Sequence, residues 1–158
     1  MTDDIQRAIR HEAGHAAAAL HLGFGVERVS VSNGMPLTEL WLDSPERTRQ
    51  ERFIVLAAGI AAEQFFYGRY DLKACGKDAT MISDRGGFSI ETYLPEALEI
   101  MKSNESRLRR LVGSLTCRMH EECAEAAFVA GGALEDSNPP SFELLSKEKI
   151  QDLWRGTD

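Results

Sequence analysis

The feature that most constrains this chain is the pentapeptide H-E-A-G-H at positions 11–15, which lies inside an alanine-rich apolar stretch. Small and apolar residues surround the pentapeptide on nearly every side, and this predicts a buried α-helix over Ile5–Leu22. Residues four apart lie on one face of a helix, so His11 and His15 can direct their imidazoles at a single point. Buried polar side chains need partners because an unpaired one is costly. The stretch therefore predicts a buried helix with a metal site.

The chemistry of the pentapeptide favours zinc. Zinc takes neutral histidine nitrogens as ligands, and a catalytic zinc keeps one position open for water. Glu12 lies roughly 100° around the helix from His11, beside the metal position, where its carboxylate can act as general base toward that water. The alternative is a surface helix with solvated histidines, and the surrounding alanines argue against it. The spacing is typical of zinc peptidases.

A third protein ligand is needed, and the residues offer four candidates: His21, Glu63, Asp78 and Asp84. His21 has the metzincin spacing, but Ala18 replaces the glycine of that motif and a straight helix turns His21 about 120° away from His15. Glu63 would give a thermolysin-like site with a glutamate from a second helix. Asp78 and Asp84 lie on a predicted short helix over 77–84. Spacing alone leaves the three carboxylates open.

The rest of the chain predicts a mainly α (α+β) fold in one domain over 1–158, with one small β-hairpin. Two alternating stretches, 26–32 and 37–42, flank an Asn33-Gly34 turn signal. A second helix is expected from Ser44-Pro45-Glu46 to Tyr67, with Gly68 as its end. Helical periodicity over 89–130 indicates two pieces. Residues 135–141 read as a linker, and 142–154 as a last amphipathic helix.

Composition excludes several classes of protein. The 158 residues carry a net charge of −7, which disfavours nucleic-acid binding. Three widely spaced cysteines give no disulfide framework, so we expect a reducing compartment. The longest apolar run, 53–62, is half of what a membrane span of about 20 residues needs. Residues 1–4, Met-Thr-Asp-Asp, are acidic and polar and unlike a signal peptide, so a cytoplasmic location is expected.

The motif residues resemble the peptidase domain of FtsH-type AAA proteases. Residues 9–16 are similar to the H-E-A-G-H-A segment of that family, and 56–68 to its G-G-R-A-A-E-E-L-x-F-G helix. The segment around Asp78 resembles the G-A-S-N-D segment, and 146–153 the closing helix. The chain departs from the family at Ala74 and Ile60, where the family has glycine and arginine.

The resemblance implies a site. His11, His15 and Asp78 would bind Zn²⁺, Glu12 would be the base, and Glu63 would support a ligand rather than bind the metal. Cys75, three residues before Asp78, is a candidate for an inhibitory thiol or an extra ligand, but a small buried residue is the simpler interpretation. Imidazole sites also accept iron, cobalt and nickel.

We therefore expect a zinc-dependent metalloendopeptidase that hydrolyses peptides or unfolded proteins without ATP. The sequence contains no G-x-x-x-x-G-K-[ST] motif, so ATP-driven unfolding would require a separate ATPase partner. Three alternatives stay open: a catalytically silent scaffold or peptide-binding module, a peptidase subunit dependent on such a partner, and a hydrolase of non-peptide amides. The apolar side chains of Phe65, Phe66 and Tyr67 could form a contact surface in a homo-oligomer, although packing in the core is the simpler interpretation.

Overall fold

The computed structural model describes residues 1–73, 75–129 and 141–156. They form a mainly helical α+β fold with six α-helices and a three-stranded antiparallel sheet, as the sequence predicted for the fold class. In chain order the elements are α1 (Asp3–Leu22), β1 (Gly25–Ser32), β2 (Met35–Trp41), α2 (Arg49–Tyr67), α3 (Gly76–Asp84), the 3₁₀ helix η1 (Ile90–Tyr93), α4 (Leu94–Ser103), α5 (Glu105–Val129), β3 (Phe142–Ser146) and α6 (Lys147–Arg155). The expected linker, apart from its last residue, lies outside the described residues.

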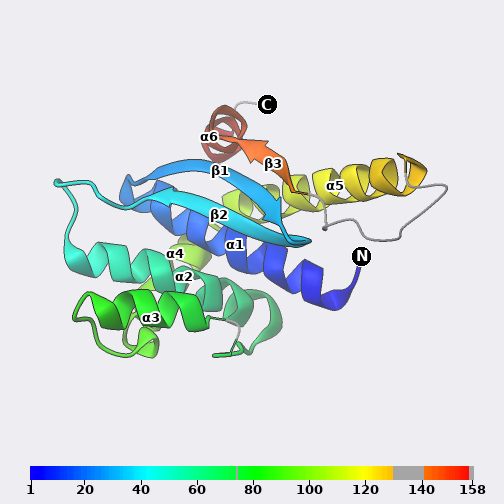
Figure 1. Ribbon diagram of the computed structural model, residues 1–158. Helices are drawn as coiled ribbons and strands as arrows, with labels where there is room; N and C mark the ends of the chain where they lie inside the picture. The colour runs from blue at the N-terminus through cyan, green and yellow to red at the C-terminus, as the bar shows by residue number, and fades with distance from the viewer. Residues whose placement is uncertain (74, 130–140, 157–158) are drawn as a thin grey trace.

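Helix α1 is the central element. Thr2 caps its start, with its hydroxyl accepting the Ile5 N–H at 3.4 Å, and Gly23 ends it at φ 77°. The sheet lies on one side of α1 and α2 on the other (Figure 1). Gly14 allows the two helices to approach closely, because a Cβ there would stand 2.3 Å from the Ala58 carbonyl oxygen. None of the described helices is long and apolar enough to cross a membrane.

The predicted hairpin is present as β1 and β2. Its turn uses Asn33 at φ 52° and Gly34 at φ 77°, the left-handed conformations that a tight two-residue turn requires. Strand order in the sheet is β2-β1-β3, so within the described part of the chain β2 pairs with a strand along one edge only. Strand β1 is central, and β2 is the edge strand that lies nearer to α2 and α3 (Figure 1).

The third strand corrects the sequence analysis. Residues 142–154 were expected to form one helix, but Phe142–Ser146 pairs with β1 and the helix begins only at Lys147. Ser146 ends the strand and caps α6, because its hydroxyl accepts the Lys149 N–H at 3.4 Å. The apolar residues at 144 and 145 are buried against the fold. Their partner strand lies more than a hundred residues earlier, so local periodicity could not reveal the pairing.

Helix α2 starts later than predicted. Thr48 and Glu51 form a reciprocal capping box, so the helix begins at Arg49 and not at Ser44-Pro45-Glu46. It ends at Gly68, as expected, with φ 69°. The stretch 53–63 is buried throughout, and α2 packs along α1 with the carboxylate of Glu63 inside the interface. The predicted break in the later helical region falls at Asn104, between α4 and α5.

Candidate metal centre

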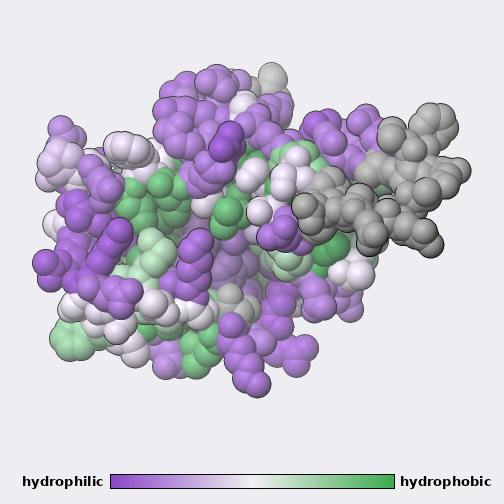
Figure 2. Space-filling view, in the orientation of Figure 1, coloured by the Kyte–Doolittle hydropathy of each residue, from purple (hydrophilic) through white to green (hydrophobic). Residues whose placement is uncertain are grey.

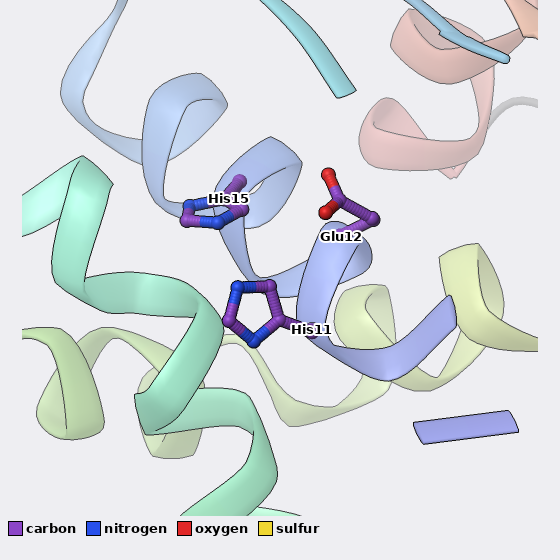
Figure 3. A group of neighbouring side chains, drawn as sticks. All are labelled: His11, Glu12 and His15. Carbon is purple, nitrogen blue, oxygen red and sulfur yellow. The ribbon is translucent and has the colours of Figure 1, made fainter. Parts of the chain in front are cut away.

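The two histidines of the pentapeptide lie one turn apart on the face of α1 that meets α2. Their ring centroids are 4.8 Å apart at an interplanar angle of 75°, and the residues are only 7% and 5% exposed. Figure 3 shows the imidazoles of His11 and His15 side by side, with the Glu12 carboxylate on another side of the helix. Gly59 of α2 leaves room for the first ring, because a Cβ there would stand 2.2 Å from His11 Nε2.

Each imidazole is held through its Nδ1 atom. His11 Nδ1 lies 2.8 Å from Glu63 Oε1, and His15 Nδ1 lies 2.8 Å from the carbonyl oxygen of Val55. Both partners accept hydrogen bonds, so each Nδ1 carries the proton and donates it. When the rings are neutral, both Nε2 atoms then present lone pairs, the arrangement that orients histidine ligands in metal proteins.

Asp78 of α3 completes a triangle with the two imidazoles. Its Oδ2 lies 3.4 Å from Nε2 of His11 and 3.4 Å from Nε2 of His15. In a tetrahedral zinc site with bonds of about 2.0–2.1 Å, ligand atoms stand about 3.3–3.4 Å apart, since the edge is about 1.63 times the bond length. The two distances from Asp78 Oδ2 to the imidazole nitrogens therefore fit a small divalent ion.

The pKa values show strong coupling of these groups in the metal-free site. Burial works against protonation of His11, but hydrogen bonds to Asp78 and Glu63 outweigh it and raise its pKa to about 9. Burial likewise opposes the charged form of His15, yet the hydrogen bond to Asp78 leaves its pKa above the ordinary value. Burial alone would raise the pKa of Asp78, but its hydrogen bonds to the two histidines lower it. Asp78 is thus a carboxylate at neutral pH.

The side chains of the pentapeptide could hold a metal ion by themselves. His11, Glu12 and His15 each bring one nitrogen or oxygen atom to within 4.8 Å of the others. This donor set suits zinc but also iron, cobalt or nickel, so it leaves the identity of the ion open.

The Glu12 carboxylate is fixed by strand β2. Its Oε2 accepts the backbone N–H of Thr38 at 2.7 Å, and the Thr38 hydroxyl donates to the backbone carbonyl of Glu12 at 2.9 Å. These two bonds hold the carboxylate beside the metal position and tie the edge strand to α1. Thr38 was not found from the sequence, because no spacing rule connects a strand residue to a helix residue 26 positions earlier.

Glu63 is a buried partner of His11. It is 1% exposed, and its Oε2 accepts the side chain of Arg7, with Nε at 2.7 Å, and the backbone N–H of Asp71 at 3.2 Å. Burial would raise the pKa of Glu63, but the hydrogen bonds from His11 and Arg7 lower it. Arg7 was also missed, although its position four residues before His11 is a signal that it shares the face of the histidines.

Of the remaining candidates, His21 and Asp84 lie apart from this cluster, whereas Cys75 lies close enough for the charge of Asp78 to act on its thiol. The Nδ1 atom of His21 pairs with Asn104 Nδ2 at 3.1 Å, away from the site. Asp84 is exposed near the end of α3, outside the set of described residues that line the cleft. Cys75 is buried, and its thiol donates to the Leu72 carbonyl at 3.1 Å. Burial, and then the charge of Asp78, raise its pKa to about 11, so Cys75 is a neutral thiol at physiological pH.

A cleft of about 780 Å³ opens over the site, with β2 on one side, α3 on the other and α1 between them. Its apolar lining comes from both walls and from α2: Met35, Leu37, Leu40, Leu42, Leu56 and Met81. On the face seen in Figure 2, apolar patches lie over and below the strands among hydrophilic side chains. The lining also includes His11, Glu12, His15 and Asp78, so the candidate metal site opens into this cleft.

The chain matches no protein-family model, and no curated protein matches its sequence. The resemblance to FtsH-type peptidases therefore rests on the motif residues and their order along the chain.

Proposed function

We propose that this chain is a zinc-dependent metallopeptidase similar to the peptidase domain of FtsH-type proteases, with peptides or unfolded protein segments as substrates. One observation carries the proposal. The Asp78 carboxylate lies 3.4 Å from an imidazole nitrogen of His11 and 3.4 Å from one of His15, the spacing of tetrahedral zinc ligands, beside Glu12 in a cleft.

The mechanism assigns a task to each side chain. His11, His15 and Asp78 would hold the ion, and a bound ion would supply Lewis-acid chemistry: it would lower the pKa of water toward about 7 and polarise the scissile carbonyl. Glu12 takes the proton of the attacking water and later delivers it to the leaving amine as the C–N bond breaks. Thr38 donates its backbone N–H to Glu12 Oε2 and so keeps the carboxylate aimed at the cleft.

The free edge of β2 suits an extended substrate. The Thr38 N–H donates to Glu12 and points away from β1, so the alternation of an antiparallel strand turns Pro36 and Leu40 to the same edge. Proline has no N–H, so the groups offered there are the Pro36 carbonyl and the N–H and carbonyl of Leu40. A peptide in the cleft could pair with these groups as an added strand. A folded domain could not enter a cleft of this size, so folded substrates would require a separate unfolding partner.

The test is cleavage of a pool of unstructured peptides by the zinc-loaded chain and by Glu12→Gln. The variant keeps the metal ligands, so we expect full zinc binding with cleavage reduced by about 10²–10⁴-fold, the usual loss on removing a general base. Glu46→Gln, a change at an exposed loop residue outside the cleft, is the matched control and should cleave like the native chain.

Native-level cleavage by the zinc-loaded Glu12→Gln variant would disprove the role of Glu12. Tight zinc and peptide binding by the native chain without any cleavage would instead favour a binding module.

A further inference from the structure

We propose that Arg7 is a positioning residue of the metal centre that acts on His11 through Glu63; the inference rests on the zinc site of the proposed function. Arg7 lies on α1 one turn before His11, and His15 lies one turn after it. The three side chains thus form a row along one face of α1. The carboxylate of Glu63 from α2 lies between the first two members of this row.

Hydrogen bonds connect Arg7 to Glu63 and Glu63 to His11. Arg7 Nε donates to Glu63 Oε2 at 2.7 Å, and a terminal nitrogen of the same guanidinium lies 2.5 Å from that oxygen. The other oxygen, Oε1, holds His11 Nδ1 at 2.8 Å. The backbone N–H of Asp71 also reaches Oε2, at 3.2 Å. One carboxylate therefore connects the guanidinium to the nitrogen that sets the orientation of the first histidine.

Because Glu63 is buried, its charge depends on the contact with Arg7. Glu63 is only 1% exposed, so its charge is not hydrated and depends on the cation and donors around it. Two nitrogens of one planar guanidinium reach the same oxygen, and this fixes the carboxylate more rigidly than a single donor could. Among the described residues, the Asp71 N–H would be the one donor left on Oε2 without Arg7, and Oε1 would lose its alignment with His11.

Charge repulsion and positioning predict opposite changes in zinc affinity when Arg7 is removed. A cation one helical turn from a zinc ligand repels zinc, so loss of the charge alone should tighten zinc binding. Loss of positioning should weaken zinc binding instead, and the partners of metal-ligating histidines typically contribute 10–100-fold in affinity. The sign of the change in zinc affinity therefore separates the two explanations.

The experiment measures zinc affinity by chelator competition for the native chain, Arg7→Ala, Arg7→Lys and Arg10→Ala. Arg10 is the matched control, since it is on the same helix beside His11 but stacks on Phe66 and Tyr67. We expect about 10–100-fold weaker binding for Arg7→Ala, a smaller loss for Arg7→Lys, and no loss for Arg10→Ala. The visible absorption of bound Co²⁺, which reports ligand geometry, should change in Arg7→Ala and not in Arg10→Ala.

Unchanged or tighter zinc binding by folded Arg7→Ala would overturn the inference while leaving the zinc site intact. If Arg7→Ala fails to fold, Arg7→Lys decides, because native affinity in that variant would show that the fork of the guanidinium is not needed. A native chain that binds no zinc would defeat the proposed function itself, so the two failures are distinguishable.

Discussion

At the scale of single residues, the two histidines of the site differ in the acceptor that holds them. His11 donates to a buried carboxylate and His15 to a backbone carbonyl, while both Nε2 atoms face Asp78. In the metal-free protein, a proton on Nε2 of either histidine can therefore be donated in a hydrogen bond to the Asp78 carboxylate. A metal ion at this place has to displace that proton, so ion binding and protonation compete for the same nitrogen atoms.

This competition gives a pH dependence with a defined sign. The pKa of His11 is about 9 in the folded metal-free chain against an ordinary 6.5. The stabilisation from its protonated form is therefore complete below about pH 6.5 and is lost as pH rises toward 9. We expect the free energy of unfolding of the metal-free protein to fall by on the order of 1–3 kcal/mol across this window, as measured by urea denaturation with chelator present.

The zinc-loaded protein is the control for this pH series. Its histidines would be neutral, so it should not lose stability over the same window, and its zinc affinity should rise with pH. Metal-free protein that becomes more stable between pH 6.5 and 9 would contradict the assignment of the protonated site.

At the scale of elements, the site depends on how closely α1 and α2 approach. Gly14 lets the helices meet, and Gly59 leaves the space that the His11 ring fills. The same contact brings Glu63 and the Val55 carbonyl to the histidines. The packing of two small-residue faces therefore sets the orientation of the candidate ligands.

Gly59→Ala tests this dependence. The added Cβ would stand 2.2 Å from His11 Nε2, so the ring must move and we expect zinc affinity to fall by at least about 10²-fold. Gly113→Ala is the control on α5, where a Cβ meets no described atom within 4 Å. It should keep zinc affinity and stabilise the fold by about 0.5–1 kcal/mol. Native zinc affinity in Gly59→Ala, measured by chelator competition, would refute this packing argument.

The helices and strands could be predicted from the sequence where the residues that determine them are close together along the chain. The centre of the site could be placed because His11, Glu12 and His15 lie on one helix of known geometry. Strand β3 could not be found, since its partner is remote and its apolar residues also fit a helix. The start of α2 was misplaced because Pro45 and the Thr48 capping box offered competing signals.

At the scale of the whole molecule, the candidate site is assembled from four elements. Helix α1 provides the histidines and the base, α2 provides Glu63, α3 provides Asp78, and β2 provides Thr38. Spacing along the chain could not choose among Glu63, Asp78 and Asp84, because that choice depends on how these elements pack. The fold brings Asp78 to the two imidazoles and puts Glu63 behind one of them, and the role of each stays a prediction.

The most direct test of the central claim is zinc K-edge X-ray absorption of the loaded protein, with Asp78→Asn and the matched control Asp84→Asn. We expect one zinc per chain with two imidazole nitrogens and oxygen ligands at about 2.0–2.1 Å and no sulfur. Asp78→Asn should lose an oxygen ligand and bind zinc more weakly, while Asp84→Asn should match the native spectrum. A sulfur ligand, a shell without imidazole, or a native spectrum and zinc affinity in Asp78→Asn would contradict the account.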